Sequence, residues 1–291
     1  MTELPIKVCE LCNHTQFEVL FDMGFKVLLC RNCGLIFVGD RDRDYRKYYA
    51  EEYNCGLRAD GRFIENEKSD EDVFKWIIKH LPITENLTLL EIGCNAGFLL
   101  KRFKDYGIDV FGVELGQKAA AFAEQVIGTD KIKCCMLEDI EGTERTYDVV
   151  ILIQTLEHFA YPLNSLLKIR SLLKRDGVLF IEVPNYYAPN GFYRLKFGEL
   201  SYPSPNHLFV YTPRTLRAFL RKAGFSIHKT IYTLWNIRMI ARVDGDDRTV
   251  EFENYYRVMI YFRLFSILRK AVYLARLFKG KLRQMRYRDL D

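Results

Sequence analysis

Two pairs of cysteines near the start of the chain have the spacing of a tetrahedral metal site. Two residues separate Cys9 from Cys12, and two residues separate Cys30 from Cys33. Each pair offers two thiolates from one tight turn, and four thiolates complete the coordination of a Zn²⁺ ion. We therefore expect structural zinc here, with no open position for catalysis. The alternatives are two disulfides or four unrelated buried thiols, and a cytosolic setting disfavours the disulfides.

A turn that contains two glycines is the second candidate site. An apolar stretch at residues 88–92 runs into Gly93 and Gly97 and then into a predicted helix. These glycines allow a sharp bend and a close approach of the helix N-terminus to a ligand. Glu114 ends the next predicted strand, where an acid can accept both hydroxyls of a ribose. The turn lacks the G-x-G-x-x-G spacing that packs on a pyrophosphate, so the pattern disfavours a dinucleotide cofactor.

The third group combines a carboxylate with two imidazoles. Glu157 and His158 follow an apolar stretch at residues 147–152, and His207 follows a later one. We expect all three at the carboxyl edge of one sheet, where α/β proteins bind their ligands. A histidine there can act as a general base toward a hydroxyl acceptor. One alternative is a divalent cation at Glu157, His158 and His207, and another is that Glu157 and His158 only brace the loop by hydrogen bonds.

Helices and strands in alternation must position these residues. The spacing of apolar residues predicts a helix over residues 70–81. Strands are predicted at residues 88–92, 108–114 and 147–152, and a β-hairpin at residues 225–233 and 235–242. Such alternation is typical of α/β proteins.

These segments resemble, in the same order, the motifs of class I S-adenosylmethionine-dependent methyltransferases that carry an N-terminal zinc ribbon. The resemblance covers residues 9–230 and includes residues 172–181, which are similar to the LLKPGG-strand signature of that group. Asn95 stands where a third glycine is common, and asparagine tolerates the positive φ of such a turn. The resemblance implies an α/β fold with a doubly wound, mostly parallel seven-stranded sheet, and S-adenosylmethionine as the cofactor.

The resemblance also implies roles for single residues. A Glu-x-x-Glu-His motif with a distant histidine binds a divalent metal in some related O-methyltransferases. Gln154 stands at the first acid position of that motif, and a neutral amide is a poorer ligand for a hard cation. The expected cofactor-binding residues are Glu91, Gly93, Cys94 and Gly97 at the methionine part, Glu114 at the ribose, Leu137 at the adenine and Gln154 near the methyl group.

Four segments make up the expected domain organisation. Residues 1–40 form the zinc ribbon, and residues 41–83 form a linker and the N-terminal helix. Residues 84–252 form the methyltransferase domain, within which residues 185–206, rich in Tyr, Pro, Gly and Asn, form a substrate lid. Residues 253–291 form a basic amphipathic helix.

The C-terminal segment holds the positive charge of the chain. The whole chain has a net charge of +5, and residues 253–291 contain ten Lys or Arg and three Asp or Glu, a balance of +7, which leaves −2 for the rest. A nucleic-acid partner is therefore not expected. A helix over residues 259–278 with an apolar and a basic face suits an anionic membrane surface. It also suits packing on its own domain or on a second subunit of a homodimer.

The expected function is methyl transfer to a small molecule, at a hydroxyl or carbon of a sugar or glycan intermediate. The alternatives are an RNA 2′-O-methyltransferase, a nucleotide-cofactor oxidoreductase and a non-catalytic zinc-containing binding protein. The sequence contains neither a secretory signal pattern nor about 18 consecutive uncharged apolar residues. We expect a cytoplasmic protein, with the membrane surface as an alternative location.

Overall fold

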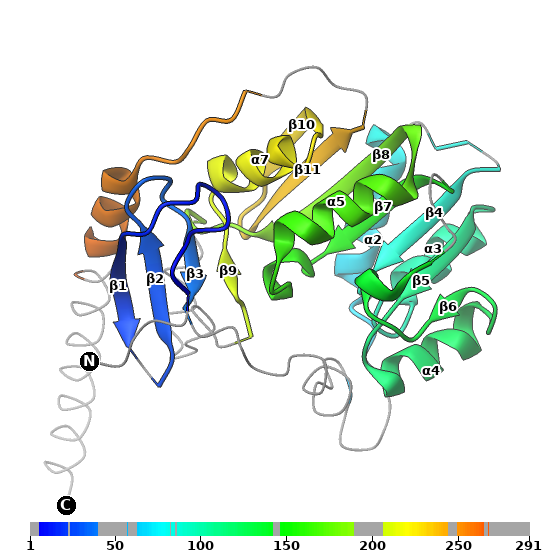
Figure 1. Cartoon of the computed structure of the whole chain (residues 1–291). Coiled ribbons are helices and arrows are strands. Elements are labelled where there is room, and N and C mark those ends of the chain that lie inside the picture. Colours follow the sequence, from blue (N-terminus) through cyan, green and yellow to red (C-terminus); the bar gives the residue numbers. More distant parts are fainter. Residues whose placement is uncertain are drawn as a thin grey trace, which may run out of the picture.

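The computed structural model describes residues 6–22, 24–39, 57, 63–81, 83–84, 86–141, 146–188, 206–243, 249–264 and 267. Its central sheet consists of β4 (Thr88–Ile92), β5 (Asp109–Val113), β6 (Ile132–Lys133), β7 (Tyr147–Ile153), β8 (Leu173–Pro184), β10 (Ser226–Tyr232) and β11 (Asn236–Arg242). The strands lie in the order β10-β11-β8-β7-β4-β5-β6 (Figure 1). All neighbours from β8 to β6 pair in parallel, whereas β11 is antiparallel to β8 and to β10. The expected seven-stranded, mostly parallel sheet is confirmed, with the hairpin at its edge.

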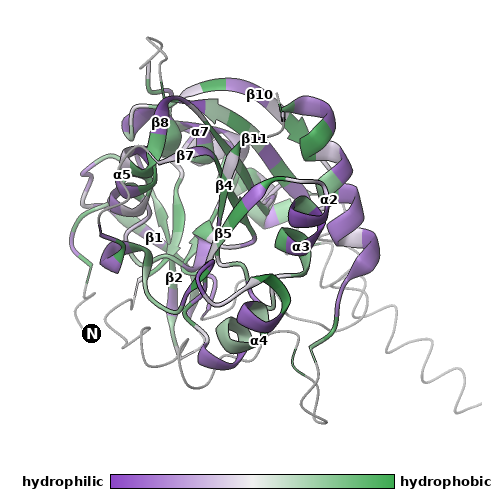
Figure 2. Ribbon diagram, turned by 90° about the vertical axis from the view of Figure 1, so that its right-hand side faces the viewer, coloured by the Kyte–Doolittle hydropathy of each residue, from purple (hydrophilic) through white to green (hydrophobic). Residues whose placement is uncertain are grey.

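Helices cover both faces of this sheet because its central strands are apolar on both sides. In β7, Val149 and Ile151 face the helices α2 (Glu67–His80), α3 (Phe98–Asp105) and α4 (Gln117–Ile127). Val150 and Leu152 face the opposite core, which contains α5 (Pro162–Leu172) and α7 (Pro213–Lys222). Figure 2 shows α5 on one side of the sheet and α2 and α3 on the other. The parallel strands therefore end at one edge, and the turns that follow them meet there.

Helix α2 begins three residues earlier than the sequence analysis placed it. Its N-cap is Asn66, whose side-chain Oδ1 accepts a hydrogen bond from the backbone N of Ser69 at 3.3 Å. Such a cap satisfies one of the free N–H groups of the first turn. The apolar spacing marks the later turns of this helix, whereas the cap sets its beginning.

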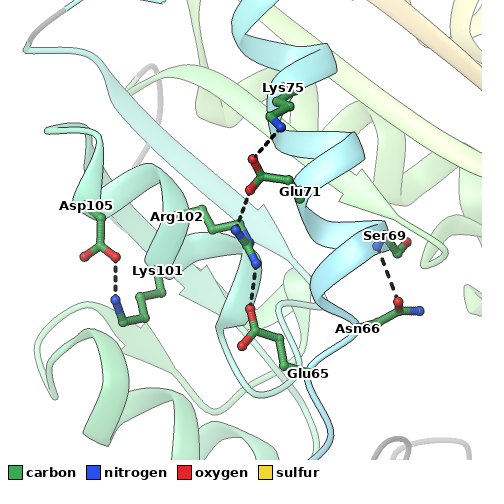
Figure 3. Close-up of polar contacts among 8 residues, drawn as sticks. All are labelled: Glu65, Asn66, Ser69, Glu71, Lys75, Lys101, Arg102 and Asp105. Atoms are coloured by element: carbon green, nitrogen blue, oxygen red, sulfur yellow. Dashed lines mark hydrogen bonds and ion pairs between the residues drawn. The ribbon is translucent and has the colours of Figure 1, made fainter.

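An arginine of α3 holds α2 in place. The guanidinium of Arg102 lies between the carboxylates of Glu65 and Glu71 (Figure 3), and its Nη2 is 2.9 Å from Glu65 Oε1. Lys75 pairs with the same Glu71 carboxylate, 3.0 Å away. This ion-pair network fixes the first turn of α2, which also carries Asp70, against α3.

A second, smaller sheet joins the N-terminal strands to a strand that precedes α7. It contains β1 (Phe17–Asp22), β2 (Lys26–Cys30), β3 (Ile36–Val38) and β9 (Phe209–Val210) in that order, and all pairs are antiparallel. Strands β1 and β2 form a hairpin between the two cysteine pairs. The sequence analysis missed β3 and β9, and β9 comes from the region just before α7 (Figure 1). The N-terminal strands are therefore part of one body with the central domain.

The beginning of the C-terminal segment is helical at residues 255–264 and packs on this second sheet. Val258 and Met259 are buried against strands β2, β3 and β9. The ring of Phe262 meets that of Phe21 edge to face, with 5.1 Å between their centroids. The sequence analysis expected a helix over residues 259–278; the described helix begins earlier, at residue 255, and the side that carries Phe262 packs on the sheet. None of the described helices has the length and apolar composition needed to cross a bilayer.

Two expected segments fall largely outside the description. Of the lid at residues 185–206, residues 189–205 lie outside the described part of the chain, and so does most of the linker before residue 63. Residues 268–291 lie outside it as well.

Candidate active site

The glycine turn after β4 has the backbone that the sequence analysis expected. Gly93 and Gly97 have φ values of +75° and +77°, a region that side chains with a Cβ rarely adopt. A Cβ at Gly93 would lie 2.6 Å from Oγ1 of Thr155, and one at Gly97 would lie 3.1 Å from Cβ of Ala123. Asn95 also has a positive φ, of +48°. The start of the turn therefore lies against Thr155, which follows β7, and the N-terminus of α3 lies against α4.

Glu114 is held by backbone donors at the end of β5. Its Oε2 accepts a hydrogen bond from the N of Asn95 at 2.9 Å, and its Oε1 accepts one from the N of Gly116 at 2.7 Å. Burial raises the pKa of this carboxyl, and the two backbone bonds oppose that rise. Each carboxylate oxygen keeps a further lone pair. The carboxylate is thus fixed in place and still able to accept two hydroxyls.

Glu91 is a buried acid whose Oε2 has no hydrogen-bond partner among the described residues. Only 4% of the surface of Glu91 is exposed to solvent. Burial raises its pKa well above the ordinary range, and the charges of Asp70 and Glu114 raise it further. A buried polar atom without a partner is costly, so this oxygen is a candidate to receive a donor from a ligand.

Asp70 is a member of this acidic group that the sequence analysis missed. It lies in the first turn of α2, and burial raises its pKa to about 6, with the charge of Glu65 as the second cause. Asp70 belongs to no recognisable sequence motif. Carboxylates are common in the first turn of a helix because they interact favourably with the helix dipole, so its position alone does not indicate a site. Packing of α2 on α3 is what brings it toward Glu91.

Cys94 and Leu137, two of the expected cofactor-binding residues, are buried. Cys94 is buried, burial raises the pKa of its thiol, and its Sγ lies 2.7 Å from the point where a Cβ on Gly112 would be. Leu137 is buried in the short 3₁₀ helix η2 (Leu137–Asp139) that follows β6. Both side chains pack in the apolar cores on either face of the sheet, and their contact with a cofactor stays a prediction.

Gln154, at the end of β7, is held in an unusual conformation by β8. Its φ is +51°, and its backbone N donates to the O of Glu182 at 2.9 Å. Its Nε2 donates to Oε1 of Glu182 at 3.3 Å, which leaves the amide Oε1 as an acceptor. Glu182 is itself buried, accepts from Nδ2 of Asn236 at 2.8 Å and pairs with Arg238. The sequence analysis missed these three partners, because only the pairing of β8 with β11 brings them together.

Glu157, His158 and His207 lie together, as the sequence analysis expected. One ligand atom from each lies within 4.8 Å of those of the other two. Glu157 and His158 belong to the 3₁₀ helix η3 (Leu156–His158), which follows Thr155, the neighbour of Gly93. The cluster is therefore adjacent to the glycine turn.

The ionisation of this cluster follows from its burial. Glu157 is fully buried, and neither carboxylate oxygen has a hydrogen-bond partner among the described residues. Burial raises its pKa to about 8. Nδ1 of His158 donates to the O of Asn206 at 2.8 Å, which leaves Nε2 as the basic nitrogen of the neutral ring. Burial lowers the pKa of His158, so this imidazole is neutral near pH 7.

The four N-terminal cysteines also lie together, and all four are free thiols. The Sγ atoms of Cys9 and Cys33 are 3.6 Å apart, and those of Cys12 and Cys30 are 3.5 Å apart. A zinc tetrahedron with Zn–S bonds of about 2.3 Å has sulfur atoms about 3.8 Å apart. The pKa of Cys33 is raised well above its ordinary value, first by its contact with Cys12. Four crowded thiols of this kind fit a tetrahedral cation.

Comparison with known proteins identifies a methyltransferase domain in this chain. Residues 64–230 match the family model described as a methyltransferase domain, which is more than half of the chain. Among curated relatives, the Ubiquinone biosynthesis O-methyltransferase of Glaesserella parasuis serovar 5 is 30% identical over 110 residues, and that of Cereibacter sphaeroides is 32% identical over 105 residues. The matches cover 34% and 35% of this chain and 46% and 42% of those relatives, so the chain matches less than half of their length.

Solved structures show the same fold at low sequence identity. The PH0226 protein from Pyrococcus horikoshii OT3 is 16% identical, with a TM-score of 0.50 over 69% of this chain and 98% of its own. A chain from the complex between the Haloferax volcanii Trm112 methyltransferase activator and a putative methyltransferase is 18% identical, with a TM-score of 0.50 over 62% of this chain and 94% of its own.

Proposed function

Because the chain belongs to the family of methyltransferase domains, we propose that it transfers a methyl group from S-adenosylmethionine to a hydroxyl group of a small molecule, with His158 as the base. The observation that carries this proposal is the cluster of Glu157, His158 and His207 beside the glycine turn. The cluster combines a neutral imidazole with a buried carboxyl, next to the edge that fits the cofactor.

The residues at the sheet edge fit the cofactor. S-adenosylmethionine supplies a methyl group on a positively charged sulfonium. Glu91, with its free buried oxygen, would hold the amino-acid end together with the Gly93 turn. Glu114 would accept the ribose hydroxyls, with its carboxylate already oriented by Asn95 and Gly116. A group of buried acids with raised pKa values favours a cationic ligand.

His158 would take the proton of the acceptor hydroxyl. Its Nδ1–H bond to Asn206 fixes the ring and leaves Nε2 to accept a proton. Methyl transfer otherwise requires mainly the alignment of donor and acceptor. A hydroxyl acceptor agrees with the name of the curated relatives, which are O-methyltransferases.

The cluster also fits a divalent cation. Carboxylate and imidazole ligands suit such ions, and a histidine that donates its other N–H to a backbone carbonyl is the usual arrangement of a metal ligand. Gln154, at the first acid position of the motif, donates its Nε2 to Oε1 of Glu182. In that alternative Nε2 of His158 would bind the cation instead of taking the proton, and the cation would lower the pKa of the acceptor hydroxyl. The four-cysteine cluster would hold a separate, structural zinc ion.

The proposal also concerns the kind of molecule that carries the accepting hydroxyl. A sugar or glycan intermediate is the sequence-based prediction, and it relies on the aromatic residues of the lid. An RNA acceptor is disfavoured because the chain outside residues 253–291 has a net charge of −2.

The His158→Gln variant tests the base. We expect the variant to bind S-adenosylhomocysteine as the wild type does and to lose roughly 10²–10⁴-fold in kcat, because only proton removal is affected. The measurement is transfer of labelled methyl from S-adenosylmethionine to a panel of phenols and sugars, with His228→Gln, on the exposed face of β10, as the matched control. An unchanged pH profile of kcat in His158→Gln would contradict the assignment.

A further inference from the structure

The helix at residues 255–264 has two apolar faces. The inner face, which includes Val258, Met259 and Phe262, is covered by the second sheet. On the opposite side a row of large apolar side chains faces solvent. We call this row the outer stripe; its members and their exposed fractions are Tyr256 (72%), Ile260 (59%), Leu264 (55%) and Ile267 (63%).

Helix geometry shows that the outer stripe is one surface. A helix turns by about 100° per residue, so these four positions fall within an arc of about 80°. The same geometry places the inner residues Val258 and Phe262 on the opposite side of the helix. Ordinary surface helices leave a polar face toward water. An apolar row of this length on the outer side therefore indicates a surface that contacts something else.

Charge identifies the kind of partner. Residues 254–288 contain ten Lys or Arg and no Asp or Glu. Arg257 and Arg263 are both exposed, and by the same helical geometry they lie on the two flanks of the outer stripe. The acid that precedes the helix, Glu253, is buried. The partner must therefore accept apolar side chains and neutralise several cations at the same time.

We propose that the outer stripe docks on an anionic lipid surface, with the helix lying parallel to it. Apolar side chains would enter the boundary of the acyl chains while the arginines remain among anionic headgroups. A second copy of the chain is a poorer partner, because it would place the same uncompensated cations opposite one another. The inner face is already anchored on the second sheet, so docking would hold the whole domain at the membrane surface.

Vesicle co-sedimentation of the full chain tests the proposal. We expect the wild type to bind vesicles of phosphatidylcholine with phosphatidylglycerol, to release them at high salt and not to bind phosphatidylcholine alone. The double variant Ile260→Asn/Leu264→Asn should bind about tenfold more weakly or worse, because two aliphatic side chains no longer leave water.

The matched control replaces two exposed apolar residues outside the outer stripe by asparagine. Leu167 and Leu234 are exposed apolar residues on α5 and in the β10–β11 turn, and Leu167→Asn/Leu234→Asn should bind vesicles as the wild type does. Both double variants should keep the binding of S-adenosylhomocysteine, which shows that they fold. Equal vesicle binding by the stripe variant and the control would overturn the proposal. So would a dimer in sedimentation velocity that the stripe variant alone converts to monomer, because the partner would then be a second copy.

Discussion

At the scale of single residues, the site contains buried acids, and burial disfavours the charged form of each. Burial raises the pKa of Glu157 to about 8 and that of Asp70 to about 6, and it raises the pKa of Glu91 as well. Each of these carboxyls reduces the stability of the unliganded protein near neutral pH. A cationic cofactor or cation would recover that free energy on binding, which is a common property of functional sites.

Glu157 should make stability depend on pH in a defined direction. Between pH 4.5, its ordinary pKa, and about 8, the unfolded chain has lost a proton that the folded protein keeps. Stability therefore falls as pH rises through this window. The Glu157→Gln variant lacks this effect, so its melting temperature relative to wild type should increase from pH 5 to pH 8 in buffer without divalent cations. The control is the exposed Glu141→Gln. A temperature difference that does not change with pH would refute the raised pKa.

The same variant tests the divalent cation. Mn²⁺ should raise the melting temperature of the wild type at pH 8, because the ion binds the folded carboxylate. Glu157→Gln should lose this response, whereas Glu141→Gln should keep it. A Mn²⁺ effect of equal size in all three proteins would place the ion outside the cluster.

Glu114 should control cofactor affinity. The Glu114→Ala variant removes the acceptor for two hydroxyls and leaves the N–H groups of Asn95 and Gly116 without their partner. Lost hydrogen bonds to a charged group are worth about 1.5–3 kcal/mol each, so affinity for S-adenosylhomocysteine should fall at least about tenfold. Calorimetric titration measures this, with Glu141→Ala as the control. Wild-type affinity in Glu114→Ala would remove the ribose assignment.

At the scale of elements, the pairing of β8 with β11 orients a residue of the candidate site although neither strand carries a proposed catalytic group. Arg238 lies opposite Glu182 in the register of the two strands, and Asn236 lies opposite Pro184. Through Glu182 this pairing orients Gln154 at the end of β7. Likewise, the contact of α2 with α3 positions Asp70. Elements that carry no catalytic group thus determine how the site residues lie.

The Glu182–Arg238 pair should be necessary for folding stability. Both side chains are nearly buried, with 4% and 12% of their surfaces exposed. Arg238→Met leaves an uncompensated buried carboxylate and should lower the free energy of unfolding by about 3–5 kcal/mol. Urea denaturation measures this loss. The double variant Glu182→Gln/Arg238→Met should recover part of it, and a double variant as unstable as the single one would show that packing, not charge, is lost.

At the scale of the whole molecule, the cysteine cluster and the methyltransferase domain share one core. Buried Cys9, Cys30 and Cys33 belong to the same apolar cluster as Leu156 and Phe209. Strand β9 connects the small sheet to the region that precedes α7. The N-terminal strands, the C-terminal helix and the central sheet therefore support one another.

Loss of the predicted zinc should consequently destabilise the catalytic domain. Cys9→Ser/Cys12→Ser removes two of four ligands, and we expect a loss of bound zinc and a lower melting temperature in a single transition. Zinc content and thermal unfolding with S-adenosylhomocysteine measure the two effects, with the exposed Cys134→Ser as the control. Full zinc content in the double variant would refute the metal site. A separate early transition, with the cofactor-stabilised one unchanged, would refute the shared core.

The amino-acid sequence by itself determined the features that depend on neighbours along the chain. Apolar strands, the positive φ at Gly93 and Gly97 and the cysteine spacing follow from local sterics and short-range periodicity. The resemblance that these motifs carry implied the seven-stranded sheet, which the strand order confirms.

The tertiary structure decided what depends on contacts between distant segments. Strand β9 has only two residues, and its place beside β3 is set by packing rather than by propensity. Asp70 is positioned by the packing of α2 on α3, and Arg238 acts on Gln154 through Glu182 because β11 pairs with β8. No local sequence pattern predicts either arrangement. Both faces of the C-terminal helix are apolar, so local periodicity cannot predict which of them is buried. Packing on the second sheet decides this.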